Sequence, residues 1–377
     1  MIVMCVCHFD ETNAYGGLEK QAKLLSQRLL GRVRDLIVIA STRELSRAKH
    51  YESHGLKTRL FWTYTTPQVS GKKLPASLVW ALQVLMWTFW NRKKITVFHS
   101  HQIRIHAFVG AIAQKYWGIP HVAKSASGGP GADIKTIGSH KYFGRRGRDF
   151  IIRNTQAFIA TTQSIRDDLL EYGVPDHKIA VIPNGLSFPA EAPRFAKRSK
   201  RCVFLGRLSS DKNILKLAMA AEAVMLNTDY YLDIYGQGEL RPELEKLLHD
   251  RDMKHVSYKG FVENTFELLP QYGWLMLPSD AEGLSNAMLE AMACGVVPLT
   301  TRVSGCVDHI IPDETGYFFQ DVSPQSLIEG ISLICGAPES RWETLSDNVR
   351  RYSAARFSID RVADEYIKLY RILGIKE

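Results

Sequence analysis

The sequence predicts two α/β domains, each built on a parallel, doubly wound sheet. Its 377 residues exceed one ordinary hydrophobic core, and strand patterns alternate with helical patterns in both halves. The alternation stops over 186–200, where two prolines and a basic cluster occur without periodicity. We therefore expect a first domain over 1–185, a linker over 186–200 and a second domain over 201–355. A terminal helix over 356–377 is expected to pack back towards the first domain.

The composition is that of a soluble globular protein, with 45% hydrophobic and 23% charged residues. The sequence contains no run of eighteen uninterrupted apolar residues, so we do not expect a transmembrane helix. The opening MIVMCVCHF is interpreted as a first strand and not as a signal peptide. The six cysteines are scattered without zinc-like spacing, which fits a reduced cytoplasm.

Charge differs strongly between the two halves of the chain. Residues 1–200 hold 30 Lys and Arg against 13 Asp and Glu, whereas residues 201–377 hold 18 against 26. This asymmetry predicts an anionic partner for the first half. The sequence has no recognition-helix or aromatic-basic motif, so we do not expect nucleic acid. An anionic inner-membrane surface or a phosphate-bearing acceptor fits better.

The first half alternates strands and helices in order. Its first helix repeats leucine and alanine on one face, and the helix after the fifth strand is expected to be capped by Ser164. A glycine-rich loop, 128–133, follows the fourth strand. The predicted strands are 1–9, 35–42, 95–102, 121–127, 157–163 and 178–185, and the predicted helices are 18–30, 108–116 and 164–173.

Residues 74–90 form the most apolar segment and precede the basic run Asn91-Arg92-Lys93-Lys94. An interfacial segment with tryptophans and a basic flank would suit membrane docking. A helix buried against the sheet fits the same pattern, and we favour that interpretation.

The second half repeats the alternation. Its predicted strands are 202–208, 231–238, 256–262, 274–277, 296–299 and 316–321, and its predicted helices are 212–226, 239–249, 284–293, 324–335 and about 358–373.

The stretch 274–300 is a strand–loop–helix–strand unit that carries Glu282 in its loop and Glu290 in its helix. Open α/β sheets bind ligands beyond the carboxyl ends of their strands, and a helix that starts there favours a phosphate. Carboxylates beside such an anion are suited to accept hydrogen bonds from hydroxyl groups, which a sugar nucleotide offers. The alternative is that Glu282 is a solvated loop acid and Glu290 an exposed helix residue.

Two cations are predicted at the same rim as Glu282. Arg207 lies at the tip of the strand over 202–208, and Lys212 opens the next helix. An Arg fork and a Lys point charge suit a diphosphate, although ordinary surface charge is the alternative. Gly236 and Gly238 end the next strand and would serve either ligand approach or a turn.

In the first half, Gly16 and Gly17 precede a helix, which suits backbone contact with an anion or a sugar; a simple turn is the alternative. His99 and His101 share one face of a strand. His101, at the carboxyl end, could bond to a sugar hydroxyl or assist a proton transfer, whereas His99 is interpreted as a core histidine.

Two further charged residues, Lys124 and Asp133, flank the glycine-rich loop. Both could reach an acceptor.

Taken in order, these motifs resemble the retaining GT-B glycosyltransferases of glycosyltransferase family 4, the bacterial group that builds surface polysaccharides and glycolipids. The resemblance spans nearly the whole chain. The motifs are the GGxE start (Gly16, Gly17, Glu19), the HSH strand, VIPNG at 181–185, GRLSSDKN at 206–213, YGQG, and EGLSNAMLEAMACG with its Glu-x7-Glu spacing.

The resemblance implies two Rossmann-like domains facing a central cleft and a role for each matching residue. Arg207 and Lys212 would hold the diphosphate and stabilise the departing nucleoside diphosphate, and His101 would lie beside the reacting sugar. Glu282 would bind hydroxyls of the donor sugar. The remaining donor contacts would be Glu290 to the ribose, backbone near Val262 to the base, and amides of Gly283, Leu284 and Ser285 to sugar and phosphate.

Family members generally need no metal or cofactor, and two cations with a helix amino end could supply the charge of an ion. Retention is usually described as same-face attack through an oxocarbenium-like pair. Leu284-Ser285-Asn286 replaces the usual aromatic-Gly-Pro run, so this segment does not identify the sugar.

We therefore expect a cytoplasmic enzyme, peripheral on the membrane, that moves a sugar from a nucleotide donor to a lipid-linked or polysaccharide acceptor with retention. Lipopolysaccharide, capsule or exopolysaccharide synthesis would be its setting. One alternative is a sugar-nucleotide epimerase, which acceptor-dependent release of nucleoside diphosphate would exclude. The other is a non-catalytic sugar-nucleotide-binding subunit, against which Arg207, Lys212 and Glu282 together argue.

Overall fold

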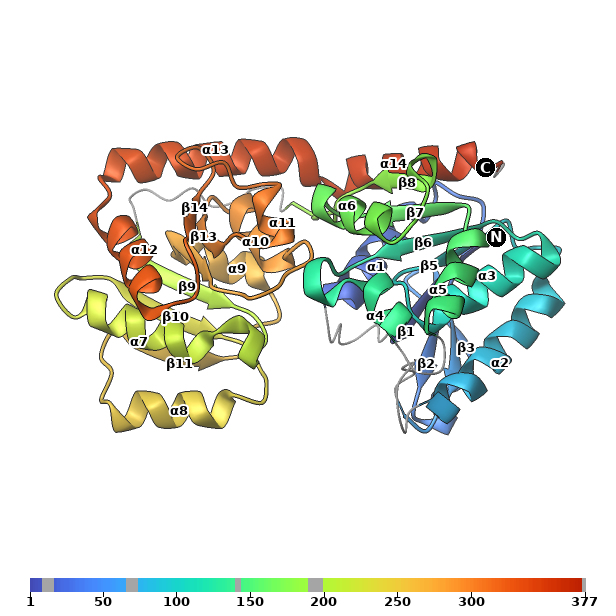
Figure 1. The fold of residues 1–377 in the computed structure, drawn as a ribbon, viewed down its shortest axis with the longest axis horizontal. Coiled ribbons are helices and arrows are strands. Elements are labelled where there is room, and N and C mark those ends of the chain that lie inside the picture. Colours follow the sequence, from blue (N-terminus) through green and yellow to red (C-terminus); the bar gives the residue numbers. More distant parts are fainter. Residues whose placement is uncertain (9–16, 66–73, 140–143, 189–198, 375–377) are drawn as a thin grey trace. The chain divides into compact units, whose positions relative to one another are not determined.

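The computed structural model divides into two compact units (Figure 1). It describes residues 1–8, 17–65, 74–139, 144–188 and 199–374. The first unit joins Met1–Gly185 to Ile359–Glu377, and the second is Leu186–Ser358. The predicted site residue Gly16 and most of the predicted linker lie outside the described residues.

The first unit contains an eight-stranded sheet in the order β3-β4-β2-β1-β5-β6-β7-β8. All neighbours pair in parallel except β3 and β4, which form an antiparallel hairpin through His54 and Gly55, with φ of 48° and 77°. This hairpin adds an edge that the sequence analysis did not predict. The strands are β1 (Ile2–His8), β2 (Leu36–Thr42), β3 (His50–Ser53), β4 (Leu56–Trp62), β5 (Val97–Ser100), β6 (His121–Ser125), β7 (Ala157–Ala160) and β8 (Ile179–Val181).

Helices cover both faces of this sheet. Along β1, Met4 points to the core shared with α1 and α14, whereas Val3 and Cys5 point to the core shared with α2 and α3. This alternation follows from the period of two in a strand that is buried on both faces. The helices are α1 (Gly17–Leu29), α2 (Leu74–Asn91), α3 (Ile105–Trp117), α4 (Asp133–Ser139), α5 (Gly144–Arg153), α6 (Gln163–Glu171) and α14 (Ile359–Ile372).

The predicted cap of α6 is wrong by two residues. Thr162 has extended backbone angles, and its hydroxyl accepts a hydrogen bond from the Ile165 amide at 3.1 Å. Ser164 lies inside the first turn, where a side chain can no longer act as the cap.

Helix α2 has one side buried against the sheet and one side exposed, so each of the two interpretations of residues 74–90 describes only part of it. Trp80 and Val84 are fully buried against the sheet, but Leu82 is 59% exposed and Trp90 is 70% exposed. Among the described helices, α2 included, none is both long and apolar enough to cross a membrane.

The last helix, α14, belongs to the first unit although it follows the second unit in sequence. Tyr366 and Tyr370 are buried in the core beneath α1. Arg32 on the α1 side pairs with Asp360 at 2.6 Å and with Asp364 at 2.9 Å.

The second unit has an entirely parallel six-stranded sheet in the order β11-β10-β9-β12-β13-β14. The chain runs outward from β9 to β11 and then returns to β12 on the other side of β9. The topological switch point therefore lies between β9 and β12. The strands are β9 (Arg201–Leu205), β10 (Tyr231–Tyr235), β11 (Val256–Gly260), β12 (Trp274–Leu277), β13 (Val297–Thr301) and β14 (Tyr317–Phe319).

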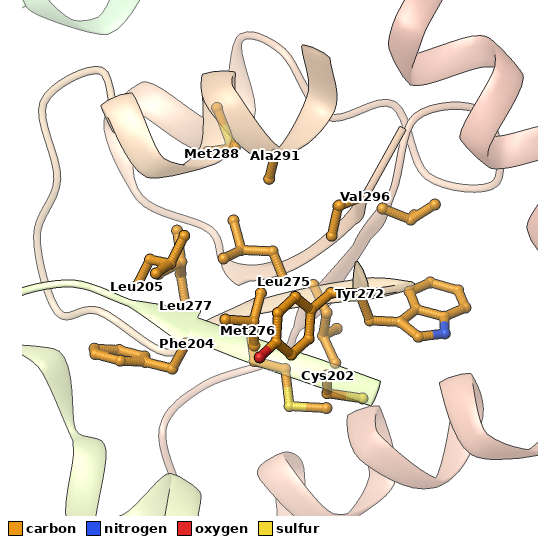
Figure 2. Packing of buried hydrophobic residues seen from close by; sticks show 14 of the residues in the cluster. Cys202, Phe204, Leu205, Tyr272, Leu275, Met276, Leu277, Met288, Ala291 and Val296 are labelled. Carbon is orange, nitrogen blue, oxygen red and sulfur yellow. The ribbon is translucent and has the colours of Figure 1, made fainter. Parts of the chain in front are cut away.

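One apolar core fills this unit, and Figure 2 shows side chains of β9 and β12 packed beneath Met288 and Ala291 of α10. Helix α12 packs beside α7, and α13 packs beside α10. Helix α13 was not predicted from the sequence. The indole Nε1 of its Trp342 donates to the Gly273 carbonyl at 2.9 Å. The helices are α7 (Ile214–Met225), α8 (Arg241–Asp250), α9 (Thr265–Leu268), α10 (Asn286–Ala293), α11 (Ser304–Val307), α12 (Pro324–Gly336) and α13 (Glu339–Phe357).

Two doubly wound α/β units are therefore confirmed. Their parallel strands place the loops that follow each strand at one edge of each sheet.

Candidate functional site

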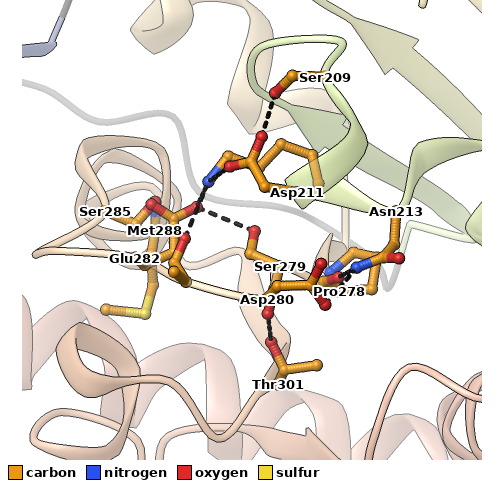
Figure 3. A network of polar contacts seen from close by, with 12 residues as sticks. Ser209, Asp211, Asn213, Pro278, Ser279, Asp280, Glu282, Ser285, Met288 and Thr301 are labelled. Carbon is orange, nitrogen blue, oxygen red and sulfur yellow. Dashed lines mark hydrogen bonds and ion pairs between the residues drawn. The ribbon is translucent and has the colours of Figure 1, made fainter. Parts of the chain in front are cut away.

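In the second unit, the loop after β9 is fastened to the loop after β12 at the switch point (Figure 3). The Asp280 amide donates to the Asp211 carbonyl at 2.8 Å. Asn213, in a left-handed conformation with φ of 50°, donates from Nδ2 to the Pro278 carbonyl at 3.0 Å and to Oδ1 of Asp280 at 2.8 Å. These bonds fix the relative positions of the two loops.

The centre of this site is an ion pair between Lys212 and Glu282. Lys212 Nζ lies 2.7 Å from Glu282 Oε1, and Ser279 Oγ donates to the same oxygen at 3.0 Å. The side chains are only 14% and 17% exposed, so neither charge is fully hydrated. Lys212 lies in the 3-10 turn Ser210–Lys212, and the helix predicted from residue 212 begins at Ile214.

Arg207, the other predicted cation, is exposed on the same loop. Its guanidinium has no hydrogen bond or ion pair with any residue that the structure describes. Its five N–H donors therefore remain available to an anionic ligand.

The two glycines after β10 have a structural requirement. A Cβ on Gly236 would lie 1.8 Å from the Gly206 carbonyl oxygen, and a Cβ on Gly238 would lie 2.2 Å from the Leu208 carbonyl oxygen. The Leu208 amide donates to the backbone carbonyl of Gln237 at 2.9 Å. The close approach that these glycines permit is thus between the loop after β10 and the loop that carries Arg207.

The loop after β13 packs equally closely on Glu282. Ser304 Oγ donates to the Glu282 carbonyl at 2.7 Å, and a Cβ on Gly305 would lie 1.5 Å from the Gly283 carbonyl oxygen. A side chain at Gly305 would therefore displace the backbone beside Glu282.

Helix α10 begins at the same edge, and Ser285 caps it by accepting from the Met288 amide at 3.4 Å. Glu290 is only 3% exposed and accepts from Thr265 Oγ1 at 2.7 Å, so it is not an exposed helix residue. Leu284 has its side chain in the core, which leaves only its backbone for a ligand.

Val262 lies two residues after the end of β11 and is half-buried. Because the sheet is parallel, Val262 lies at the edge where Arg207, Glu282 and Ser285 follow their own strands. All predicted donor-binding residues of the second unit therefore belong to loops of one edge or to α10.

In the first unit, His101 follows β5 and is 2% exposed. Neither of its ring nitrogens has a hydrogen-bond partner among the described residues. Burial lowers the pKa of His101 well below its usual value, and the charge of Lys124 lowers it further. The imidazole is therefore neutral near pH 7.

His99 is a core histidine, as predicted. Its Nδ1 lies 2.7 Å from the Tyr370 hydroxyl, and its ring stacks on Tyr366 with centroids 5.5 Å apart. Helix α14 thus supplies both tyrosines that contact His99.

Lys124 and Asp133 are buried and bind different partners. Lys124 Nζ donates to Asn184 Oδ1 at 2.9 Å, and burial lowers the pKa of Lys124 to about 7. Asp133 accepts from Gln102 Nε2 at 3.0 Å and from the Ala126 amide at 2.8 Å, while burial raises its pKa.

Gly17, another predicted site residue, is the first residue of α1.

Four polar partners were missed by the sequence analysis. Asn184 stands in the VIPNG motif and Asn213 in GRLSSDKN, so the motifs contain them but do not reveal what they bind. Ser279 lies three residues before Glu282, and no pattern separates it from an ordinary turn residue. Thr265 is remote in sequence from Glu290, and only the fold brings them together.

No group of three or more His, Cys, Asp or Glu side chains within the described ranges is arranged to hold a metal ion.

Comparison with protein families matches both halves of the chain. Residues 16–185 match the family described as glycosyl transferase 4-like domain, and residues 190–351 match glycosyl transferases group 1.

Two curated relatives share about a quarter of their residues with this chain. An alpha-D-kanosaminyltransferase of Streptomyces kanamyceticus is 23% identical over 326 residues, which cover 78% of this chain and 83% of that protein. A UDP-Gal:alpha-D-GlcNAc-diphosphoundecaprenol alpha-1,3-galactosyltransferase of Escherichia coli is 25% identical over 309 residues, which cover 76% and 79%.

Among solved structures, Alr3699/HepE of Anabaena in complex with UDP-glucose aligns with a TM-score of 0.76 at 16% identity. The alignment covers 98% of this chain and 99% of that one. At that identity the likeness concerns the fold.

Proposed function

We propose, from the premise that this chain is a glycosyltransferase of the GT-B fold, that it transfers a sugar from a nucleotide-sugar donor to a lipid-linked or polysaccharide acceptor with retention of configuration. The setting we propose is bacterial surface polysaccharide synthesis. The structure contains no disulfide between cysteines of the described residues, which fits a reducing compartment, and we assign the reaction to the cytoplasm.

The observation that carries this proposal is the Lys212–Glu282 ion pair at the switch point beside Arg207. Lys212 and Arg207 would bind the diphosphate, with Arg207 as the fork and Lys212 as the point charge. Both cations would then stabilise the negative charge that develops on the departing nucleoside diphosphate.

The carboxylate of Glu282 would accept hydrogen bonds from hydroxyl groups of the donor sugar. Ser279 and Lys212 hold this carboxylate in place in the absence of a ligand, so it needs little reorganisation. Glu290 would accept from the ribose, and backbone near Val262 would contact the base. Backbone amides of Gly283 to Ser285 would complete the contacts to sugar and phosphate.

In the first unit, the neutral His101 would lie beside the reacting sugar. Its two unpaired ring nitrogens can accept from one hydroxyl and donate to another acceptor, or share in a proton transfer. Gly16 and Gly17 would contribute further contacts to the donor, and Lys124 and Asp133 would contact the acceptor.

Metal independence is part of the proposal because Arg207, Lys212 and the amino end of α10 supply positive charge at one edge. Retention is supported by the α-linked products in the names of the two relatives. The diphosphoundecaprenol acceptor in the name of the Escherichia coli relative supports a lipid-linked acceptor.

The first experiment identifies the donor by thermal-shift measurements with UDP-, GDP- and dTDP-sugars, since a ligand that binds only the folded state raises Tm. Turnover is then measured as release of free nucleoside diphosphate with and without a membrane extract that contains acceptors. Release only with acceptor is expected for a transferase.

Replacing Glu282 tests the site itself. Glu282→Gln removes the charge that accepts from the sugar, and we expect kcat/KM to fall by about 10- to 100-fold, the range for a hydrogen bond to a charged group. Glu343→Gln, at an exposed carboxylate of α13, is the matched control and should retain activity. Unchanged turnover of Glu282→Gln would refute the assigned role.

A further inference from the structure

Helix α2 presents an apolar outer face that the fold does not need. Its buried side, which includes Trp80 and Val84, already packs into the core against β1 and α3. The outer side consists of large apolar side chains that are 41% to 70% exposed: Leu78, Val79, Leu82, Met86, Phe89 and Trp90. We call these six residues the α2 stripe.

The α2 stripe is continuous along the helix. At 100° per residue its members fall within about one third of the helix circumference. Residues 74–91 contain no charged side chain at all. A contiguous exposed patch of this kind marks a surface that binds an apolar partner.

The carboxyl end of α2 is strongly basic. Arg92, Lys93 and Lys94 follow it directly, and the guanidinium of Arg92 lies over the Phe89 ring, 4.1 Å from its centroid. Lys93 and Lys94 are exposed. The apolar stripe therefore ends in a cluster of cations.

Lys93 and Lys94 also line a cavity of about 640 Å³ at the amino edge of the first sheet, beside Ile2 of β1. Arg34 and Arg371 contribute two more cations to its lining, and Asp35 is the acidic residue among the described residues that line it. Asp35 is paired with Lys57 at 2.8 Å, so its charge is largely compensated. These four cations make the cavity suited to a phosphate-bearing headgroup.

Apolar stripe and cationic cavity together match one kind of partner. We propose that the α2 stripe lies in the surface of an anionic phospholipid membrane, with a lipid phosphate bound at Lys93 and Lys94. An interfacial helix inserts its apolar face to about 5–10 Å, and basic residues at its rim attract anionic lipids. The excess of cations over 1–200 acts in the same direction.

This inference rests on α2 and the cavity and not on the proposed reaction. His101 and Lys124 follow strands at the carboxyl edge of the same sheet, whereas the cavity lies at the amino edge. Membrane binding and turnover can accordingly be measured and can fail separately.

The test is co-sedimentation of the full chain with phosphatidylcholine vesicles that contain or lack phosphatidylglycerol. We expect binding to the anionic vesicles at least tenfold tighter than to the neutral ones, and weaker binding as salt is raised. Inorganic phosphate at constant ionic strength should weaken binding less than removal of phosphatidylglycerol does, because phosphate competes for Lys93 and Lys94 but offers no apolar surface. Complete displacement by phosphate would overturn the assignment to a membrane.

Two variants separate the stripe from the cations. Leu82→Ser combined with Trp90→Ser should weaken binding by at least tenfold, because both side chains lose apolar contact with the bilayer. Lys93→Glu combined with Lys94→Glu should weaken binding to anionic vesicles by about tenfold or more, since each basic residue near such a surface contributes about 1 kcal/mol.

Matched controls are Leu226→Ser and Lys216→Glu, which change an exposed leucine and an exposed lysine of the second unit. Both should bind as the unchanged protein does. All altered side chains are exposed, and unchanged thermal unfolding verifies that each variant folds.

A second measurement addresses insertion directly. Brominated acyl chains should quench tryptophan fluorescence in the unchanged protein, and Trp90→Phe should reduce that quenching. Absence of binding to anionic vesicles, or equal binding by the stripe variant, overturns the proposal. Self-association that disappears in the stripe variant, without vesicle binding, would instead assign the stripe to contact between copies of this chain.

Discussion

At the scale of single residues, the candidate residues of the two units hold their charges differently. In the second unit the charges of Lys212 and Glu282 compensate each other across 2.7 Å. In the first unit Lys124 is buried with the neutral amide of Asn184 as its hydrogen-bond partner, and burial lowers the pKa of Lys124 to about 7. A lysine in that position gives up its proton near pH 7.

The stability of the protein should therefore depend on pH through Lys124. Its pKa is about 7 in the folded chain and about 10.4 when unfolded, so between these values the unfolded chain binds one more proton. The free energy of unfolding then rises with pH, by up to about 1.4 kcal/mol per pH unit. Lys124→Met removes this contribution.

Urea unfolding at several pH values between about 7.5 and 9.5 checks the prediction within the window set by these pKa values. The difference in unfolding free energy between the unchanged protein and Lys124→Met should grow in favour of the unchanged protein. Lys216→Met, at an exposed lysine, should give no such growth. Parallel pH curves for the unchanged protein and Lys124→Met would show that Lys124 keeps an ordinary pKa.

The sequence could predict the candidate site residues but not their hydrogen-bond and ion-pair partners. The spacing of Arg207, Lys212 and Glu282 after buried strands placed all three at one rim, because parallel strands end at a common edge. The bonds of Ser279 and Asn213 depend on loop conformation, including the left-handed backbone of Asn213. No residue pattern fixes such conformations.

At the scale of elements, α14 packs into the core of the first unit, whose other residues are distant from α14 in sequence. Tyr366 is fully buried and stacks on His99, whereas Asp360 binds Arg32 at the surface. Burial of an aromatic ring contributes much more to stability than an exposed ion pair does.

Two substitutions in α14 should therefore differ sharply. Tyr366→Ala should destabilise the first unit by about 3–5 kcal/mol, the usual cost of truncating a buried aromatic side chain. Asp360→Asn should cost less than about 1 kcal/mol. Urea unfolding followed by circular dichroism measures both, and equal effects would contradict the assigned packing of α14.

Helix α13, helix α2 and the hairpin β3–β4 show where prediction from the sequence stopped. The buried positions of α13 recur at helical spacing, but two of them are the serines Ser346 and Ser353, and the helix is otherwise rich in charged residues, so its apolar stripe is weak in the sequence. Helix α2 is apolar on both sides, so its sequence could not reveal which side packs. The short hairpin β3–β4 depends on its two-residue turn at His54 and Gly55.

At the scale of the whole molecule, the second unit is continuous in sequence and the first is not. The core cluster of the second unit draws all its residues from Leu186 to Phe357. That unit also carries Arg207, Lys212, Glu282 and Glu290.

A fragment of residues 186–358 should therefore fold alone and bind the donor. We expect one cooperative thermal transition and a Tm rise with the nucleotide sugar that stabilises the full chain. The same fragment with Lys212→Ala should show a smaller rise in Tm when the nucleotide sugar is added. A fragment that folds but gains no stability from the donor would mean that donor binding requires residues of the first unit.

The position of α14 also sets an order of events during protein synthesis. A ribosome produces residues 186–358 before it produces the helix that closes the first unit, and domains fold as their chain emerges. The second unit can therefore be complete while Val362, Tyr366 and Tyr370 are still absent from the core of the first. Until translation reaches them, the nascent chain exposes the apolar surface of α1 and β1, and chaperones have their longest opportunity to bind there.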